Sequence, residues 1–398
     1  MRISRLPSDV QRTIVDGLIQ TTTPRASPRR NVQNLRNLLA AERGMAGVAA
    51  DLLHDLRNDQ SLDLFRFEAR LQCMSESAAI VARDGDPNAV KQSLVRCFEQ
   101  VGGYVGLDQR AFVHPQLVDD VMRAVVESPR VLDLFINLHG VPAEQRARVV
   151  SHLDAIRQAH PDVEHVFLGL NGQPVDRPML ESLSGSYVTH LDVAQANLDD
   201  ESLDIVGRMP RLKMLSIAGN DAITPIGLAH LATGVEARGE HDGGLTRLNA
   251  SEIHATDAHL PQIARLVHLE QLNLNRNDVT ATGAALLAEI APLKELQLAG
   301  NPIGDEGACA LGNARALEGL AVSGCGIESY GVQGLMSAPL LTRLRLDGNA
   351  LQPWCLTPIA GATRLTHISL LNTGLSSEAI QHLRAARPTL EIGHESVF

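Results

Sequence analysis

A nine-residue pattern of apolar and polar positions recurs through the second half of the chain. Each copy has apolar residues at its first, fourth and sixth positions, and all but one have Asn or a small residue at the ninth, as in LEQLNLNRN and LKELQLAGN. The copies begin at Val188, Leu212, Leu245, Leu269, Leu293, Leu317, Leu341 and Leu365. Successive starts lie 24 residues apart, except for one step of 33 that contains the polar segment GVEARGEHDGG. Such a constant period predicts a stack of equivalent units, with the insertion as a surface loop.

Within each copy the pattern predicts a short strand and then a short helix. The fourth and sixth positions, such as Leu272 and Leu274, alternate with polar residues and therefore point inward from a strand. The ninth position ends that strand, and an Asn amide there can replace the backbone partners that the turn removes. It holds Asn220, Asn277, Asn301, Cys325 and Asn349. The segments that follow, such as TATGAALLAEIA, have apolar residues at helical spacing.

These units predict an α/β fold, a leucine-rich-repeat solenoid with concave parallel strands and short convex helices. A degenerate leading copy, VEHVFLGLN, starts at Val163, so we expect about nine repeats in a domain over residues 161–398. Residues 61–160 lack the repeat, and segments such as PQLVDDVMRAVVES have apolar residues three and four positions apart. We expect a helical linker or cap there, preceded by a small helical module over residues 1–60. An all-helical N-terminal region would then precede the solenoid.

Composition indicates which classes of partner to exclude and in which kind of compartment the protein works. The 398 residues include 35 Lys and Arg against 46 Asp and Glu, and this net charge of −11 argues against nucleic acid as the main partner. The five cysteines are scattered without CxxC spacing, which favours a reducing compartment over a zinc site. No apolar run is long enough to span a membrane, and the N-terminus lacks the apolar core of a signal peptide. We therefore expect no membrane and no nucleic acid as partner.

The motifs of the common enzyme classes do not occur in the sequence. There is no GxSxG, HExxH or P-loop, and no Cys is followed two positions later by Asp. The spacing of His152, His160 and His165 matches no familiar metal set, so we interpret them as surface histidines. We expect a binding protein without catalytic residues, metal or small-molecule cofactor. An enzyme whose active site lies in residues 62–160 without a recognisable motif is an alternative.

The N-terminal residues resemble an F-box, the helical module with which substrate receptors of ubiquitin ligases bind the Skp adaptor. They read LPSDVQRTIVDGL, which has an L-P-x-x-V-x-x-x-I pattern, and the later segment NLRNLL continues the similarity. The repeats carry the tracts GAALLA from Gly283 and GACAL from Gly307, which resemble repeats of the GALA type. An F-box followed by GALA-type leucine-rich repeats is the layout of a family of type III effectors of plant-pathogenic bacteria.

This resemblance implies a virulence protein that is secreted by the type III route, without a cleavable signal peptide, into the host cytoplasm. Leu6, Pro7, Val10 and Ile14 would bind a host Skp-type adaptor, and the repeats would hold an unknown host target protein. The protein would act as a ubiquitin-ligase adaptor by raising the effective concentration of target near ligase. The alternative is a non-catalytic leucine-rich-repeat scaffold or inhibitor whose helical domain merely caps the solenoid.

The candidate target site consists of the variable strand positions, which must face outward because the alternating Leu residues face inward. They are Arg247, Asn249, Ser251, Gln271, Asn273, Asn275, Glu295, Gln297, Arg343, Arg345, Asp347, His367 and Ser369. Arg343 and Arg345 are cations in an acidic protein, and the small residues after Leu317 predict a shallow gap beside them. Because Arg binds a carboxylate through paired donors, we expect an acidic target segment. The alternative is that these positions are simply solvated strand residues.

Overall fold

The computed structural model describes residues 104–107, 109–112, 115–239 and 244–393. These residues form two compact units. Unit 1 contains the described residues up to Leu170 together with Ser186–Thr189, and unit 2 contains Asn171–Gly185 and the described residues from His190 onward. The module expected over residues 1–60 lies outside the described residues. The domain division at 60/61 and 160/161 therefore remains a prediction.

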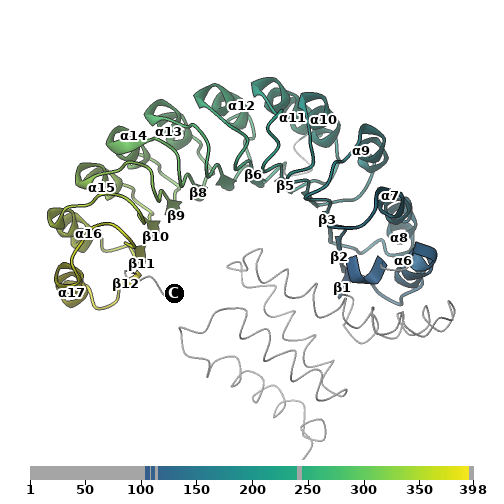
Figure 1. Cartoon of the computed structure of the whole chain (residues 1–398), viewed down its shortest axis with the longest axis horizontal. Coiled ribbons are helices and arrows are strands. Elements are labelled where there is room, and N and C mark those ends of the chain that lie inside the picture. The colour runs from purple at the N-terminus through teal and green to yellow at the C-terminus, as the bar shows by residue number, and fades with distance from the viewer. Residues whose placement is uncertain (1–103, 108, 113–114, 240–243, 394–398) are drawn as a thin grey trace, which may run out of the picture. The chain divides into compact units, whose positions relative to one another are not determined.

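Unit 1 has three parallel strands with helices between them (Figure 1). The central strand pairs on both sides, with Leu134 opposite Val105 and Val166. Its elements are β1 (Tyr104–Leu107), η4 (Gln109–Phe112), η5 (Pro115–Leu117), α6 (Val118–Val126), β2 (Asp133–Asn137), α7 (Ala143–Ser151), α8 (Leu153–Ala159) and β3 (His165–Gly169).

The prediction that residues 61–160 are entirely helical was wrong at β1 and β2. Helices do occur where apolar residues recur at helical spacing, in α6, α7 and α8. The strand β2 comes from a short apolar run, DLFIN, in which four of five residues are buried. Such a run is buried on both faces and does not alternate, so its periodicity cannot separate it from a buried helix. The 24-residue period also fails here, because Leu134 follows Val105 by 29 residues and precedes Val166 by 32.

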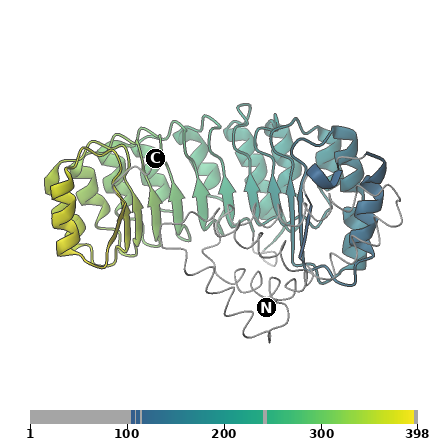
Figure 2. The same cartoon turned by 60° about the horizontal axis from the view of Figure 1, so that its bottom comes forward.

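Unit 2 is the predicted leucine-rich-repeat solenoid. Its strands β4–β12 pair in parallel and in chain order, as Figure 2 shows, and its helices lie on the outer side of the curve (Figure 1). The strands are β4 (His190–Asp192), β5 (Met214–Ser216), β6 (Arg247–Asn249), β7 (Gln271–Asn273), β8 (Glu295–Gln297), β9 (Gly319–Ala321), β10 (Arg343–Arg345), β11 (His367–Ser369) and β12 (Glu391–Gly393).

The helical segments of unit 2 follow the strands in order. They are α9 (Arg177–Leu183), α10 (Asp200–Gly207), α11 (Pro225–Ala237), η7 (Asp257–His259), α12 (Leu260–Ile263), α13 (Ala281–Ala288), α14 (Gly304–Leu311), α15 (Ser329–Leu335), η8 (Pro353–Cys355), α16 (Leu356–Gly361) and α17 (Ser377–Ala386). Their lengths vary from one repeat to the next, whereas each of the strands β4–β12 has three residues.

Stacked leucines form the core between strands and helices. The central strand residues pair in register and are at most 3% exposed: Leu191, Leu215, Leu248, Leu272, Leu296, Leu320, Leu344 and Ile368. Burying a side chain of this size stabilises the fold by about 1.5–3 kcal/mol. A repeated layer of such residues explains how a chain with 3% aromatic residues fills its core.

The Asn positions are buried and join neighbouring repeats, as predicted. Asn277 Oδ1 accepts hydrogen bonds from the backbone N–H groups of Ile253 (3.1 Å) and Ala255 (2.9 Å). Its Nδ2 donates to the carbonyls of Ala250 (2.9 Å) and Leu274 (3.0 Å). Asn220, Asn301 and Asn349 make corresponding bonds. Cys325 takes the same place, with its Sγ 3.1 Å from the carbonyl of Leu298.

In each of the eight repeats, the residue before the ninth position has a left-handed backbone conformation. It is Gly219, Gly300, Gly324 or Gly348 in four repeats, with φ from +62° to +75°. In the other four it is Gln195, Glu252, Arg276 or Asn372, with φ from +52° to +57°. Side chains other than Gly are strained in this region. The AGN, SGC and DGN tripeptides therefore place glycine where the turn requires it.

A second contact between repeats explains the glycine of the GALA-like tracts. The Asp257 carboxylate, at the start of η7, accepts hydrogen bonds from the backbone N–H (2.9 Å) and the hydroxyl (2.5 Å) of Thr280 in the next repeat. Gly283 lies beside this carboxylate. A Cβ there would overlap Asp257 Oδ1 and come within 2.7 Å of Leu260 Cδ1. Glycine at this position therefore allows the two helical segments to approach closely.

Candidate functional site on the strand face of unit 2

The variable residues of the strands form parallel rows across the strand face of unit 2. Neighbouring strands lie about 4.8 Å apart, so residues in register are direct neighbours. The first row runs Met214, Arg247, Gln271, Glu295, Gly319, Arg343 and His367. The second row runs Ser216, Asn249, Asn273, Gln297, Ala321, Arg345 and Ser369. All the predicted target-site residues on these strands thus share one face, and Ser251, Asn275 and Asp347 follow two positions after the second row.

Arg343 forms an ion pair with Glu295 across the strand between them. The intervening residue of the row is Gly319, and a Cβ at that position would overlap the Glu295 carboxylate. The gap predicted beside the two arginines is therefore filled by the Glu295 side chain. Arg343 therefore already has an anionic partner on the strand face.

Arg345 differs from its neighbour on the same strand. Its side chain is exposed, and it has no hydrogen bond or ion pair among residues 104–107, 109–112, 115–239 and 244–393. In its row it stands between the small side chains of Ala321 and Ser369. The nearest carboxylate along the strand, that of Asp347, accepts hydrogen bonds from Ser369 Oγ (2.5 Å) and Leu371 N (2.8 Å). The guanidinium is therefore available to a ligand.

The amide residues in the middle of the face hold one another in place. Asn249 Nδ2 donates to Ser216 Oγ (3.2 Å), and its Oδ1 accepts from Ser251 Oγ (2.9 Å). Asn275 Nδ2 donates to Gln297 Oε1 (3.0 Å). These bonds order the side chains before any ligand arrives, which reduces the entropy cost of binding.

Arg247 and His367 lie in the first row on either side of this centre. Burial lowers the pKa of the Arg247 guanidinium, partly offset by the charge of Glu270, and its Nη1 is 3.8 Å from Met214 Sδ. His367 Nε2 lies 3.1 Å from a carboxylate oxygen of Glu391 on β12. Both side chains therefore have neighbours of their own, which leaves Arg345 as the more accessible cation.

The histidines of unit 1 have structural partners. His160 is buried and its Nε2 lies 2.9 Å from the carbonyl oxygen of Val125, so its interpretation as a surface histidine was wrong. His165 Nδ1 lies 2.9 Å from the Asp133 carboxylate. Packing of α8 against α6 buries His160, which sequence spacing could not reveal.

A charged cluster between α6 and α7 is the other notable polar feature of unit 1. The Asp119 carboxylate accepts a hydrogen bond from Arg148 Nη2 (2.6 Å) and lies 3.1 Å from His152 Nε2. The Arg148 hydrogen bond, followed by that of His152, holds the pKa of Asp119 below its ordinary value of 3.8. His152 is half-buried by this contact rather than fully exposed.

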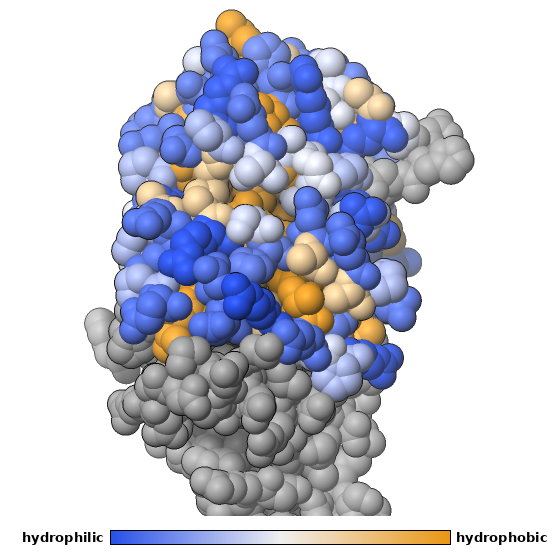
Figure 3. All heavy atoms as spheres, turned by 90° about the vertical axis from the view of Figure 1, so that its right-hand side faces the viewer, coloured by the Kyte–Doolittle hydropathy of each residue, from blue (hydrophilic) through white to orange (hydrophobic). Residues whose placement is uncertain are grey.

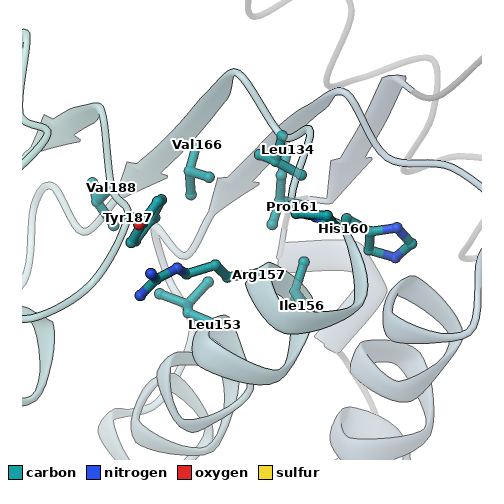
Figure 4. Close-up of a pocket in the computed structure, with 10 residues that line it drawn as sticks. Leu134, Leu153, Ile156, Arg157, His160, Pro161, Val166, Tyr187 and Val188 are labelled. Atoms are coloured by element: carbon teal, nitrogen blue, oxygen red, sulfur yellow. The ribbon is translucent and has the colours of Figure 1, made fainter.

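A small cavity lies in unit 1 next to an arginine–tyrosine contact (Figure 4). The Arg157 guanidinium stands over the Tyr187 ring, 3.4 Å from its centroid. The cavity has a volume of about 20 Å³, with walls that include Leu134, Ile156 and Val166. That volume holds roughly one water molecule and is too small for a substrate.

No group of three or more His, Cys, Asp or Glu residues among the described residues could hold a metal ion. None of the helices in the described ranges is long and apolar enough to cross a membrane. On the face seen in Figure 3, hydrophilic residues predominate and apolar ones form small separate areas. The adaptor-binding residues predicted at Leu6, Pro7, Val10 and Ile14 lie outside the described residues.

Comparisons with known proteins agree with the repeat assignment. Residues 266–288 and 291–312 match the family model described as Leucine Rich repeat. No curated protein matches the sequence. The repeats of this chain are leucine-rich repeats.

Solved structures with a similar arrangement include two internalins of Listeria monocytogenes. Internalin C2 is 20% identical, with a TM-score of 0.41 over 56% of this chain and 83% of that one. Internalin F is 15% identical, with a TM-score of 0.43 over 74% of this chain and 93% of that one. The mouse RP105/MD-1 complex is 18% identical, with a TM-score of 0.42 over 62% of this chain and 44% of that one.

Proposed function

We propose that this protein is a binding scaffold whose strand face in unit 2 holds an acidic segment of a partner protein at Arg345. The observation that carries the proposal is an exposed guanidinium, without a partner among the described residues, between two small side chains. A guanidinium binds a carboxylate through two parallel hydrogen bonds. Two strands away in the same row, Gln297 accepts a hydrogen bond from Asn275, and these ordered amides offer further polar groups to an extended segment.

Arg343 has a supporting part in this proposal. Its ion pair with Glu295 fixes a charged pair next to Arg345, so that Arg345 is the cation left to bind. A carboxylate of the partner would then bind at Arg345 without competing with Glu295, which already pairs with Arg343. This arrangement gives selectivity for an acidic segment over a basic one.

The test is binding to purified partner candidates captured from host lysate, with Arg345→Glu compared with the wild type. A charge-assisted hydrogen bond stabilises a complex by about 1.5–3 kcal/mol, so affinity should fall at least about tenfold. Arg315→Glu is the matched control, because Arg315 is exposed beyond α14 and away from the strand face. An unchanged set of partners for Arg345→Glu, at an unchanged melting temperature, would place the binding site elsewhere.

We further propose that the scaffold acts as a ubiquitin-ligase adaptor in a host cell, with an F-box-like N-terminus. The support is the sequence resemblance of LPSDVQRTIVDGL to an F-box and of the repeats to the GALA type. In this proposal Leu6, Pro7, Val10 and Ile14 bind the Skp-type adaptor and the target is held by the repeats. The protein would be a bacterial effector delivered to the host cytoplasm, and it would work by proximity alone.

Mixing the full-length protein with a plant Skp adaptor tests this second step. A 1:1 complex on gel filtration supports it, and replacing Leu6 and Pro7 by Ala should abolish the complex while the circular dichroism stays the same. If that double variant loses its fold, the N-terminal residues serve to cap the solenoid. The protein is then a non-catalytic scaffold or inhibitor, and the Arg345 experiment still stands by itself.

A further inference from the structure

Two exposed aromatic side chains stand at equivalent positions of neighbouring repeats in unit 2. Tyr330, the second residue of α15, is 65% exposed, and Trp354, the second residue of η8, is 50% exposed. They are 24 residues apart, which is one repeat. Trp354 is the protein's single Trp and Tyr330 is one of three Tyr. Among the side chains that the structure describes, the other Phe and Tyr rings are buried or half-buried.

Folding of the repeats does not require a ring at this position. The same position, at steps of 24 residues, is Ala258, Thr282, Glu306 and Glu378 in other repeats, and all four side chains are exposed. An apolar ring left in water contributes little to the core, whereas Trp and Tyr are enriched where proteins bind one another. The two rings therefore need an explanation other than repeat packing.

The backbone beneath the rings is held by hydrogen bonds between repeats. Ser329 Oγ accepts from the backbone N–H of Gln352 (2.7 Å) and lies 3.2 Å from its carbonyl oxygen, to which it can donate. One residue earlier, the N–H of Glu328 donates to Asp305 Oδ1 (2.7 Å). The segments that carry Tyr330 and Trp354 are thus fixed to each other. α14, α15 and α16 follow one another along the outer side of unit 2 (Figure 1).

Exposed carboxylates flank the two rings along the series of repeats. Glu306 and Glu378 occupy the equivalent positions one repeat before Tyr330 and one repeat after Trp354, and Glu328 lies two residues before Tyr330. All three are exposed, and none has an ion pair in the part of the chain that the structure describes. The order along the surface is therefore carboxylate, two aromatic rings, carboxylate.

We propose that Tyr330 and Trp354, with the flanking Glu306, Glu328 and Glu378, bind a segment of a partner protein that carries two or more Arg or Lys residues. A guanidinium or ammonium group stacks on the face of an aromatic ring, most favourably on Trp. Further cations of the segment pair with the carboxylates at the two ends. This site lies among the helical segments and prefers the opposite charge from the Arg345 site, so it goes beyond the scaffold function proposed above.

Because Trp354 is the only Trp, its fluorescence reports binding at the site directly. We would titrate the full-length protein with a synthetic peptide of alternating Arg and Gly that contains no aromatic residue, and with its Glu–Gly counterpart. The Arg peptide should change the Trp354 emission saturably and less strongly at higher salt. The Glu peptide should have no effect.

Variants separate the site from the general negative charge of the protein. By calorimetry, Trp354→Ala or Tyr330→Ala should weaken Arg-peptide binding roughly five- to thirty-fold, and Trp354→Phe should weaken it less. Glu306→Gln and Glu378→Gln should each weaken it about two- to fivefold. Glu289→Gln removes the same charge from an exposed residue after α13 and should leave binding unchanged.

Several outcomes would overturn the proposal. No saturable binding up to millimolar peptide excludes the site, and equal weakening by Glu289→Gln and Glu306→Gln shows that only net charge matters. Self-association that Trp354→Ala abolishes would assign the rings to a second copy of the chain instead. Arg345→Glu should not weaken Arg-peptide binding. A result that contradicts the aromatic site can therefore be distinguished from one that contradicts the Arg345 site.

Discussion

Replacing Asn277 by Ala removes a side chain that joins two consecutive repeats. Its Oδ1 accepts from the backbone N–H groups of Ile253 and Ala255 in the preceding repeat, and its Nδ2 donates to the carbonyls of Ala250 and Leu274. The side chain is buried, with 5% of its residue surface exposed. Asn277→Ala leaves these four backbone groups without this partner.

The loss of unfolding free energy comes mainly from the backbone N–H groups of Ile253 and Ala255. Both are buried, and neither has another acceptor among the hydrogen bonds of the described residues. Each unsatisfied buried donor costs about 1–3 kcal/mol, so the variant should lose roughly 2–6 kcal/mol of unfolding free energy. The Leu274 carbonyl keeps its bond from Asn301 Nδ2 and adds little to this cost. For a domain of this size, that corresponds to a Tm lower by about 4–24 °C.

Thermal melting and amide hydrogen exchange together test the estimate. Contacts in a solenoid are between nearest neighbours, so protection should be lost first at the amides of Ile253 and Ala255. Asn313→Ala is the control, because Asn313 is exposed after α14. A melting temperature equal to that of the wild type, with unchanged exchange at both amides, would refute the reasoning that these bonds hold the repeats together.

Two further predictions concern the contact between helical segments and the charged cluster of unit 1. Gly283→Ala places a Cβ against the Asp257 carboxylate, and such overpacking should lower the unfolding free energy by about 1–3 kcal/mol in urea titrations; a neutral result would mean that the two segments can move apart freely. Asp119 has a lowered pKa, so its contribution to stability is present above the unfolded value of about 3.8 and is lost as the pH falls through the folded value. Asp119→Asn should therefore be less stable than the wild type at pH 6, with the difference shrinking toward pH 3; a difference that stays constant would contradict this.

The sequence by itself was sufficient for the fold of unit 2. A residue such as Leu272 repeats every 24 positions because each strand must present the same apolar side chain to the same layer. Register, strand position and the buried amide of Asn277 all follow from that repetition. Local pattern and tertiary environment coincide in a solenoid, since each repeat contacts mainly its neighbours.

Two features of unit 1 could not be predicted from the sequence pattern: the strand β2 and the burial of His160. The run that forms β2 is buried on both faces, and it carries no alternation that would distinguish a strand from a buried helix. The burial of His160 likewise depends on α6 and α8 meeting, since its partner Val125 lies 35 residues away in the chain. Neither feature leaves a periodic signal in the sequence.

The sequence also predicted that the variable strand residues share one face, but it could not say which of their charges are already paired. Arg343 and Arg345 are two residues apart on the same predicted strand, and the sequence gives no reason to distinguish them. Only the tertiary structure brings Glu295, 48 residues earlier, across Gly319 to pair with Arg343, and leaves Arg345 exposed. Side-chain direction follows from the two-residue period of a strand, whereas pairing depends on which strands are neighbours and on how small the residue between them is.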